Sequence, residues 1–285
     1  MTDAKILIEE MLGYKESLGR KRGTYETHLS GLAEFLDNRN LSTETVSLVN
    51  DILPWCAKRP SESSSGLRRR LAAVREFTKY LYALGKCDGV LSLDELPSYT
   101  QFVPYIFSDS ELAKVFEAGT NKATDPKDPF AREIIAVIYQ LIYFCGLRPN
   151  EGRELRRDDF DSKALTLFIG HNKTGRERVI PIARDVSELV CEYLEKRDRN
   201  HPCSPYMFPA PDGKPHTAKW LGRHFIRLWH SAYPDSSAKV RVYDLRHRFA
   251  TAVLMEWIDR GEDFFAALPY LSAYMGHNDF SSTAY

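Results

Sequence analysis

Four cationic or titratable side chains in the second half of the sequence stand where chemistry is possible: Arg148, Lys173, Arg246 and His277. An arginine offers a permanent charge and a planar fork that matches two oxygens of an oxyanion. Taken singly, each has an ordinary structural explanation. An arginine at a helix end serves the helix dipole or a surface ion pair, a lysine near a turn adds solubility, and a glycine before a histidine caps a helix. The four residues therefore support a functional argument only as a set.

The set stands in recognisable motifs. They are Gly-Leu-Arg148-Pro-Asn-Glu151, then Lys173 in a turn before Glu-Arg-Val-Ile-Pro, then Asp-Leu-Arg246-His-Arg-Phe-Ala-Thr, and finally Met-Gly-His277. In order, spacing and surrounding predicted elements, this set resembles the tyrosine recombinase family, which includes the phage integrases and the Xer-type recombinases. The resemblance covers the chain from about residue 105 to its end. It extends more loosely to the N-terminal helices, which look like the core-binding domain of that family.

The resemblance implies a role for each matched residue. Arg148 and Arg246 would bind the nonbridging oxygens of a DNA phosphodiester, where negative charge builds in the transition state, and His277 would donate a further hydrogen bond. Lys173, on a hairpin, would protonate the departing 5′ oxygen as a general acid. Glu151 matches the acidic residue that helps to position the first arginine. A tyrosine would form a 3′-phosphotyrosyl intermediate that conserves the bond energy for rejoining.

This chain departs from the family pattern at two places. Tyr243 occupies the position where the family usually has the histidine of its His-x-x-Arg motif, and a phenol, with a pKa near about 10, is a poor general base at neutral pH. The family nucleophile falls nine residues after the Gly-His histidine, which is position 286, whereas the chain ends at Tyr285. We expect a chain that stops just before its nucleophile and does not cleave DNA. The alternative is that Tyr285 itself attacks, although one residue of helix rotates a side chain by about 100°.

The first third of the sequence predicts helices, because apolar residues recur there at helical spacing. The expected spans are 6–18, 25–36 and 46–55, with Ser42 or Thr43 as a cap of the third helix. The stretch 60–66 is typical of a linker or turn.

A fourth helix follows and carries two stripes. Its apolar stripe consists of Leu67, Leu71, Val74, Leu81 and Leu84. The basic stripe beside it consists of Arg68, Arg75, Lys79 and Lys86. Such a charge run is either a solvated helix flank or a surface that binds DNA phosphates, and we assign these four residues to DNA binding.

The second domain opens at Ser108-Asp-Ser-Glu111, which has the spacing of a capping box. An apolar helix over 134–144 is expected next, and then two strands, 164–170 and 177–182, joined by a turn. Later helices are expected over 186–195, 217–229, 245–257 and 264–275. The predicted fold is mainly α with a small antiparallel sheet: a helical core-binding domain (1–90), a linker (91–104) and a catalytic domain (105–285) that lacks the segment after residue 285.

Composition limits the remaining possibilities. The formal net charge of +0 argues mildly against a nucleic-acid binder, but the local basic stretch between residues 66 and 86 answers that objection. The five cysteines are scattered without a C-x-x-C pair, so neither a zinc site nor a disulfide framework is indicated. No signal peptide or membrane span is expected, and a cytoplasmic, nucleoid-associated prokaryotic protein fits best.

The resulting hypothesis is a site-specific DNA recombinase of the integrase or transposase type, with no metal and no cofactor. Its expected partners are double-stranded recombination sites, further copies of itself in a tetramer, and possible partner recombinases. Two alternatives remain open: a non-catalytic accessory DNA-binding relative, and a type IB topoisomerase, which uses the same phosphotyrosyl chemistry.

Overall fold

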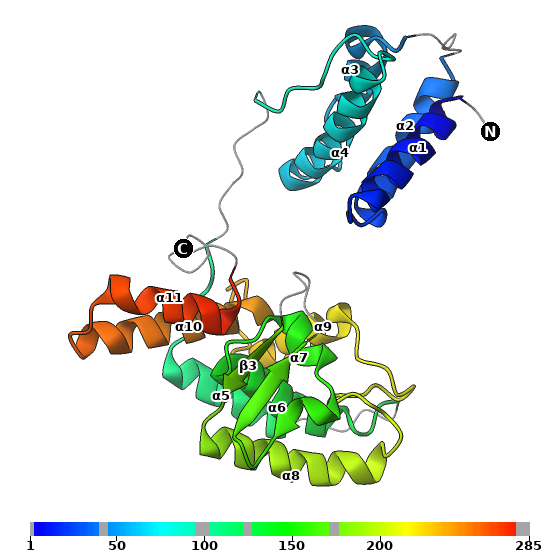
Figure 1. The fold of residues 1–285 in the computed structure, drawn as a ribbon. Helices are drawn as coiled ribbons and strands as arrows, with labels where there is room; N and C mark the ends of the chain where they lie inside the picture. Colours follow the sequence, from blue (N-terminus) through cyan, green and yellow to red (C-terminus); the bar gives the residue numbers. More distant parts are fainter. Residues whose placement is uncertain (1–2, 40–44, 95–102, 122–126, 171–176, 278–285) are drawn as a thin grey trace. The chain divides into compact units, whose positions relative to one another are not determined.

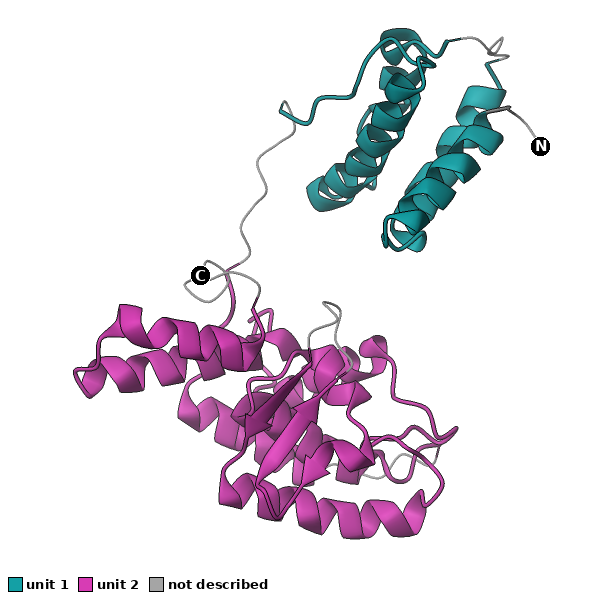
Figure 2. Ribbon diagram, viewed as in Figure 1, with its two compact units in different colours: residues 1–102 teal, residues 103–285 magenta. Residues whose placement is uncertain are grey.

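A computed structural model describes residues 3–39, 45–94, 103–121, 127–170 and 177–277. The chain forms two compact units, Met1–Phe102 and Val103–Tyr285 (Figure 2). Each unit has its own cluster of buried apolar side chains. No helix among the described residues is both long enough and apolar enough to cross a bilayer.

The first unit is helical (Figure 1). It contains α1 (Asp3–Ser17), α2 (Gly23–Asp37), the π-helical turn η1 (Leu48–Ile52), α3 (Leu53–Cys56) and α4 (Ser64–Ala83). Helices α1, α2 and α4 pack against one another. The region 46–55 is largely helical, as expected, but it is not a single α-helix. Val46 forms a β-bridge with Cys87, and the π-helical turn η1 precedes the short α3. The expected caps at 42 and 43 lie outside the described residues, and the side chain of Ser47 caps η1.

Helix α4 starts earlier and ends earlier than expected. The Ser63 side chain accepts a hydrogen bond from Gly66 N, so the helix begins inside the stretch assigned to a linker. Leu84, predicted to lie in the apolar stripe, is 48% exposed because the helix ends at Ala83. Lys86 therefore follows the helix rather than extending its basic stripe. The other four members of the apolar stripe are buried, as predicted.

The second unit is a group of helices with a small sheet on one side (Figure 1). Its elements are α5 (Asp109–Thr120), α6 (Ala131–Phe144), α7 (Pro149–Glu154), η2 (Arg157–Asp159), β1 (Phe160–Asp161), β2 (Thr166–Ile169), β3 (Arg178–Pro181), α8 (Arg184–Asn200), α9 (Ala218–Ala232), α10 (Val242–Asp259) and α11 (Phe264–Met275). The sheet is antiparallel in the order β1-β2-β3. The mainly helical fold class with a small antiparallel sheet is thus confirmed.

Helix α6 is the centre of this unit. It is apolar on most of its surface and packs against α5, α8, α10 and α7. The capping box predicted at Ser108 is confirmed: the Ser108 hydroxyl accepts from Glu111 N, and the Glu111 carboxylate accepts from Ser108 N. Gly146 follows α6 with a φ of +56° and turns the chain towards Arg148.

The register of the sheet brings one charged residue to the buried face. Leu167, Ile169 and Ile180 are buried, and Ile169 pairs directly with Arg178. Because successive side chains of a strand alternate between faces, Arg178 lies on the same face as Ile180. Val179 points the other way and is 61% exposed.

Candidate functional site

Arg148 and Glu151 are joined at the start of α7, a short helix that the sequence analysis missed. Arg148 is the residue before the helix, and Pro149 occupies its first position. The Glu151 carboxylate accepts from Arg148 N at 2.9 Å and from Arg148 Nη1 at 2.8 Å. This arrangement closes the first turn of α7 and fixes the guanidinium of Arg148 relative to the backbone.

Arg246 lies on α10 and its side chain is 1% exposed. Nη1 donates to Gly146 O at 2.6 Å, and Nη2 donates to Met275 O at 2.7 Å. Nη2 also lies 2.7 Å from Nε2 of His277. A guanidinium only donates, so this histidine nitrogen accepts and the ring proton resides on Nδ1. Within the described chain, the buried Nε of Arg246 has no hydrogen-bond partner.

Arg178 joins the same cluster, although the sequence analysis gave it no role. Its Nη1 and Nη2 donate to the two carboxylate oxygens of Glu151 at 3.1 and 2.9 Å, and its Nε donates to Tyr274 O at 2.8 Å. A signal was present in the sequence. Arg178 alternates with Ile180 and Ile182 along a strand, which places it on the buried face, where a charge requires a partner.

Three successive carbonyls at the C-terminal end of α11 each accept from a different arginine. Tyr274 O accepts from Arg178, Met275 O from Arg246, and Gly276 O from Arg148 at 2.5 Å. The last carbonyls of a helix have no partner within the helix and carry partial negative charge. The arginines therefore hold the end of α11, and with it His277, against β3, α7 and α10.

The electrostatics of this cluster favour an anion. Burial alone would raise the pKa of Glu151, but hydrogen bonding and charge from Arg178, and hydrogen bonds from Arg148, bring it down to about 2. Burial, followed by the charge of Arg148, lowers the pKa of Arg246 to about 10, which still leaves it protonated at neutral pH. Three arginines around one carboxylate leave two positive charges in excess, so the cluster is suited to binding an oxyanion such as a phosphate.

The other predicted site residues are placed less centrally or not at all. Tyr243, in the first turn of α10, is 38% exposed, and its ring centroid lies 5.2 Å from that of His247. Lys173 and Tyr285 lie outside the described residues. The ranges that the structure describes contain no group of three or more His, Cys, Asp or Glu residues that could hold a metal ion.

A second basic feature lies in the first unit. A groove of about 560 Å³ between α1, α2 and α4 is lined by cations that include Arg20, Arg69 and Arg75. The Nε of Arg75 is buried without a hydrogen-bond partner among the described residues. Arg70, by contrast, is buried and binds Glu62 at 2.7 Å and Trp55 O at 2.8 Å, so it serves the fold.

Three of the predicted DNA-binding residues are exposed, and one lines the groove. Arg68, Lys79 and Lys86 are exposed, and Lys79 donates to Glu76 at 3.2 Å. Arg75 is partly buried in the groove. Arg20 and Arg69 also line the groove but were not among the predicted DNA-binding residues, because Arg20 follows α1, far from α4 in the sequence, and Arg69 lies on α4 outside the predicted basic stripe.

Comparison with known proteins identifies the family. The model of the phage integrase family matches residues 121–285. The chain belongs to this family, that of the tyrosine recombinases. The protein y4rB of Sinorhizobium fredii is 28% identical over an alignment of 288 positions that covers 97% of this chain and 90% of that protein. The tyrosine recombinase XerD of Rhizobium meliloti is 23% identical and matches 99% of this chain and 91% of its own length.

The fold is also that of solved tyrosine recombinases. The structure of the XerH site-specific recombinase bound to its difH substrate, a pre-cleavage complex, superposes with a TM-score of 0.66 at 20% identity. The match covers 92% of this chain and 74% of that one. The resemblance inferred from the four motifs is therefore confirmed at the level of family and fold.

Proposed function

We propose that this tyrosine recombinase family member is a site-specific DNA recombinase that breaks and rejoins DNA through a 3′-phosphotyrosyl intermediate. The observation that supports the proposal best is the cluster of Arg148, Arg246 and His277 at the end of α11, with its excess of positive charge. Cations fixed before the reaction stabilise the charge that develops on a phosphoryl group without having to reorganise.

In this proposal Arg148 and Arg246 bind the two nonbridging oxygens of the scissile phosphate. Arg246 has a buried Nε without a partner in the described chain, and Arg148 is 21% exposed, so both retain capacity to bind an anion. His277 donates a further hydrogen bond from Nδ1, because its Nε2 accepts from Arg246. Glu151 keeps Arg148 in place.

Lys173 acts as the general acid that protonates the departing 5′ oxygen. The nucleophile is a tyrosine at position 286, with Tyr285 as the alternative. Its hydroxyl loses its proton to solvent and its oxygen bonds to phosphorus, while the bond to the 5′ oxygen breaks and that oxygen takes a proton from Lys173. The reverse reaction with a new 5′ hydroxyl rejoins the strand. Tyr243 contributes a hydrogen bond near the phosphate rather than a base.

The first unit binds the DNA backbone. The groove that contains Arg20, Arg69 and Arg75 concentrates positive charge in a chain with a formal net charge of +0. Contacts with phosphates release counterions and supply most of the sequence-independent affinity. Arg68, Lys79 and Lys86 add to this surface. The solved XerH structure contains such a DNA substrate, which is consistent with this assignment.

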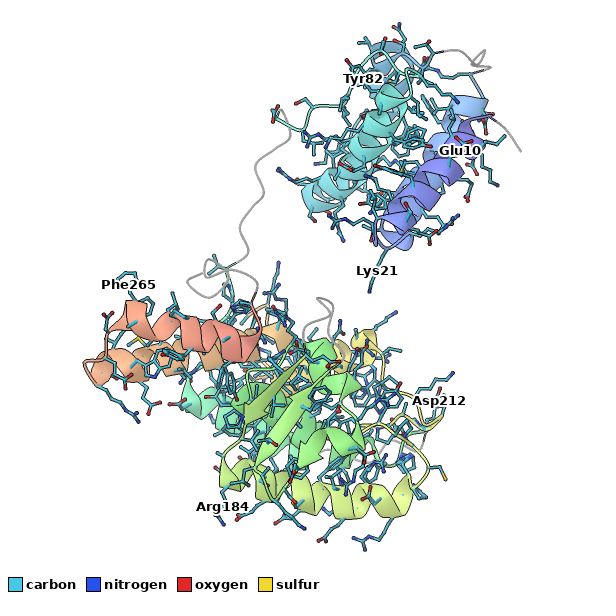
Figure 3. All side chains as sticks on the ribbon, viewed as in Figure 1. Glu10, Lys21, Tyr82, Arg184, Asp212 and Phe265 are labelled. Carbon is cyan, nitrogen blue, oxygen red and sulfur yellow. The ribbon has the colours of Figure 1, made fainter. Side chains whose placement is uncertain are left out.

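On DNA we propose a tetramer that joins two sites. The hairpin of α10 and α11 exposes several large apolar side chains, and a second copy of this chain would cover them. They are Met255, Ile258, Phe265 and Tyr270, with exposed fractions between 52 and 81%. Figure 3 shows Phe265 projecting from the start of α11.

The test is a covalent-adduct assay on a nicked duplex whose cleaved strand loses a short fragment, so that rejoining is prevented. The duplex is first selected from a random-sequence library by its binding to the gene product. Residues 1–285 are compared with the chain extended through the C-terminus encoded by its gene. The proposal predicts an adduct for the extended protein alone.

An adduct with the short chain would make Tyr285 the nucleophile. Binding without any adduct would instead support an accessory DNA-binding protein, and relaxation of supercoils without a preferred site would support a type IB topoisomerase.

A further inference from the structure

Arg178 is the member of the arginine cluster that is turned entirely towards the protein. All three nitrogens of its guanidinium group donate to protein acceptors: two to Glu151 and one to Tyr274 O. None of its nitrogens is left for a ligand, whereas the buried Nε of Arg246 has no hydrogen-bond partner among the described residues. Arg178 is therefore poorly placed to bind a phosphate itself, and its contacts instead run to groups that hold the other two arginines.

Glu151 is the first of these groups. Its side chain is 1% exposed, and its two oxygens are shared between Arg148 and Arg178. The next cation is Arg246, whose Nη1 lies 3.9 Å from Oε2 of Glu151 while it donates to Gly146 O. Without Arg178, one side of this carboxylate loses its partner, and Arg246 is the nearest cation that can be drawn away from Gly146 and Met275 to replace it.

The end of α11 is the second group. Arg178 binds the carbonyl two residues before Gly276, whose own carbonyl accepts from Arg148. Gly276 has a φ of +65°, and a Cβ at that position would lie 2.9 Å from Nη1 of Arg178. The guanidinium thus packs directly against the turn that carries His277. Removing it frees both a carbonyl and the space beside this turn.

We propose that Arg178 is a positioning residue for DNA cleavage: through Glu151 and the end of α11, it fixes Arg148, Arg246 and His277 for the scissile phosphate. This inference rests on the proposed function. Arg178 does not touch the substrate, and its effect is transmitted by the carboxylate and by the backbone of α11. Arg178 also links strand β3 to α11, and the Tyr274 hydroxyl, which donates to Pro181 O at 3.4 Å, links the same two elements.

The test compares Arg178→Met and Arg178→Lys in the extended protein, on the nicked duplex described above. The matched control is Arg197→Met, which removes another buried arginine of the same unit that binds Asp198 and Tyr206 O. Thermal unfolding, duplex affinity and single-turnover cleavage at saturating protein are measured for each variant. We expect Arg178→Met to cleave at least about tenfold more slowly while binding the duplex within about threefold of wild type.

Three further readouts separate positioning from a general loss of stability. Arg178→Lys should recover part of the cleavage rate, because one ammonium replaces only part of the fork. The double variant Arg178→Met, Glu151→Gln should cleave no more slowly than the worse single variant, because both changes break one linkage. In Arg178→Met the acid limb of the cleavage profile should move to higher pH, because Glu151 then has one cation fewer. Arg197→Met should lower stability without any of these effects.

Hydrogen exchange of residues 264–277 tests the inference without DNA, with faster exchange expected in Arg178→Met than in Arg197→Met. If the wild-type protein forms no adduct, the proposed function fails, and unchanged exchange would then overturn the positioning role as well. If the wild type cleaves and both Arg178 variants cleave at its rate, or if the effects of Arg178→Met and Glu151→Gln multiply, the positioning role alone is overturned.

Discussion

Arg246 shows at the scale of one residue how a charge is kept inside this protein. Removing a guanidinium from water is costly unless its donors are satisfied. Two of its nitrogens bind backbone carbonyls, and one of these also binds His277. The remaining buried nitrogen, Nε, is without a partner in the described chain. An arginine so placed is fixed in position before any ligand arrives, as electrostatic catalysis requires.

We predict that Arg246→Lys lowers single-turnover cleavage by about 100-fold or more, the usual cost of removing one preorganised donor to a transition state. A lysine ammonium cannot bind two carbonyls, a histidine and a phosphate from one planar fork. The matched control is Arg260→Lys at the exposed end of α10, which should cleave normally. Cleavage by Arg246→Lys at a rate close to that of wild type would contradict the assigned role.

Tyr243 is predicted to supply one hydrogen bond and no base. Changing Tyr243→Phe should slow cleavage by about two- to tenfold, which corresponds to the loss of a single hydrogen bond. The pH dependence of the rate should be the same in both proteins, because the change removes a hydrogen bond and not a base. Complete loss of the covalent adduct in Tyr243→Phe would show that this hydroxyl takes part in the chemistry.

Site residues that stand in local sequence motifs could be predicted from the sequence, whereas contacts between residues distant in the sequence could not. Arg148, Glu151, Arg246 and His277 stand in local motifs, and the structure brings all four together. Arg178 stands in a motif as well, but its role depends on the face it occupies and on which helix end lies beside it. Such partners are distant in the sequence, so alternation along the strand could reveal the burial of Arg178 but not its contacts with Glu151 and Tyr274.

At the scale of elements, the C-terminal ends of two helices supply the carbonyls that hold the arginine cluster in place. Helix α11 ends at Gly276, whose positive φ leaves the last carbonyls pointing at three arginines. Helix α6 ends before Gly146, whose carbonyl accepts from Arg246. Hydrophobic periodicity predicted the long helices well, since their cores are apolar. It missed α7, and within the helix expected over 46–55 it did not predict the π-helical form of η1, because such short elements are set by local hydrogen bonds rather than by a repeating apolar face.

The start of α9 gives a prediction for stability against pH. His216 is buried, its ring stacks on Trp220 at 3.7 Å between centroids, and burial lowers its pKa to about 4. The unfolded chain takes up this proton near its ordinary pKa of about 6.5, before the folded chain does. The stability associated with neutral His216 is therefore complete above about pH 6.5 and is lost as the pH falls towards about 4.

We predict that this loss is on the order of 3 kcal/mol in the wild-type chain. His216→Phe keeps an aromatic ring against Trp220 but cannot titrate. As the pH falls over this range, the free energy of unfolding of the variant should therefore decrease by about 3 kcal/mol less than that of the wild-type chain. Denaturant unfolding followed by tryptophan fluorescence at several pH values measures the difference. Parallel pH profiles for the two proteins would contradict the assignment to His216.

Helix α4 gives a prediction for DNA affinity. Arg75→Ala should weaken binding to all duplexes about equally and reduce the slope of log affinity against log salt by about one, because one phosphate contact is lost. Lys58→Ala, an exposed lysine outside the groove, serves as the control and should leave the slope unchanged. A loss of affinity confined to one DNA sequence would show that Arg75 reads bases rather than phosphates.

At the scale of the whole molecule, the chain consists of two cored units joined by a short segment. Composition and patterning predicted two units, because each has enough apolar residues for a separate core. The packed part of the first unit continues past residue 90, since Leu91 is buried and its amide donates to the Thr78 hydroxyl. Residues 91–104 were predicted to form a linker because their apolar residues are few and irregularly spaced.

The exposed apolar surface of the α10–α11 hairpin gives a prediction for assembly. Phe265→Ser with Tyr270→Ser should leave the affinity of one copy for one site unchanged but weaken the joining of two sites by about tenfold or more. Val49→Ser in the first unit is the control, since it removes an exposed apolar side chain that lies outside the hairpin. Analytical ultracentrifugation of protein with one-site and two-site duplexes distinguishes the outcomes. Unchanged assembly of the two-site complex would place the contact between copies elsewhere.

The proposed function depends above all on a covalent link between DNA and a tyrosine that follows the Met-Gly-His277 motif. The most direct measurement is mass spectrometry of the adduct that the extended protein forms on the nicked duplex, after digestion with protease and nuclease. The account predicts a nucleotide linked by its 3′ phosphate to the tyrosine at position 286. A nucleotide linked through a 5′ phosphate, or one attached to a residue other than a tyrosine, would contradict it.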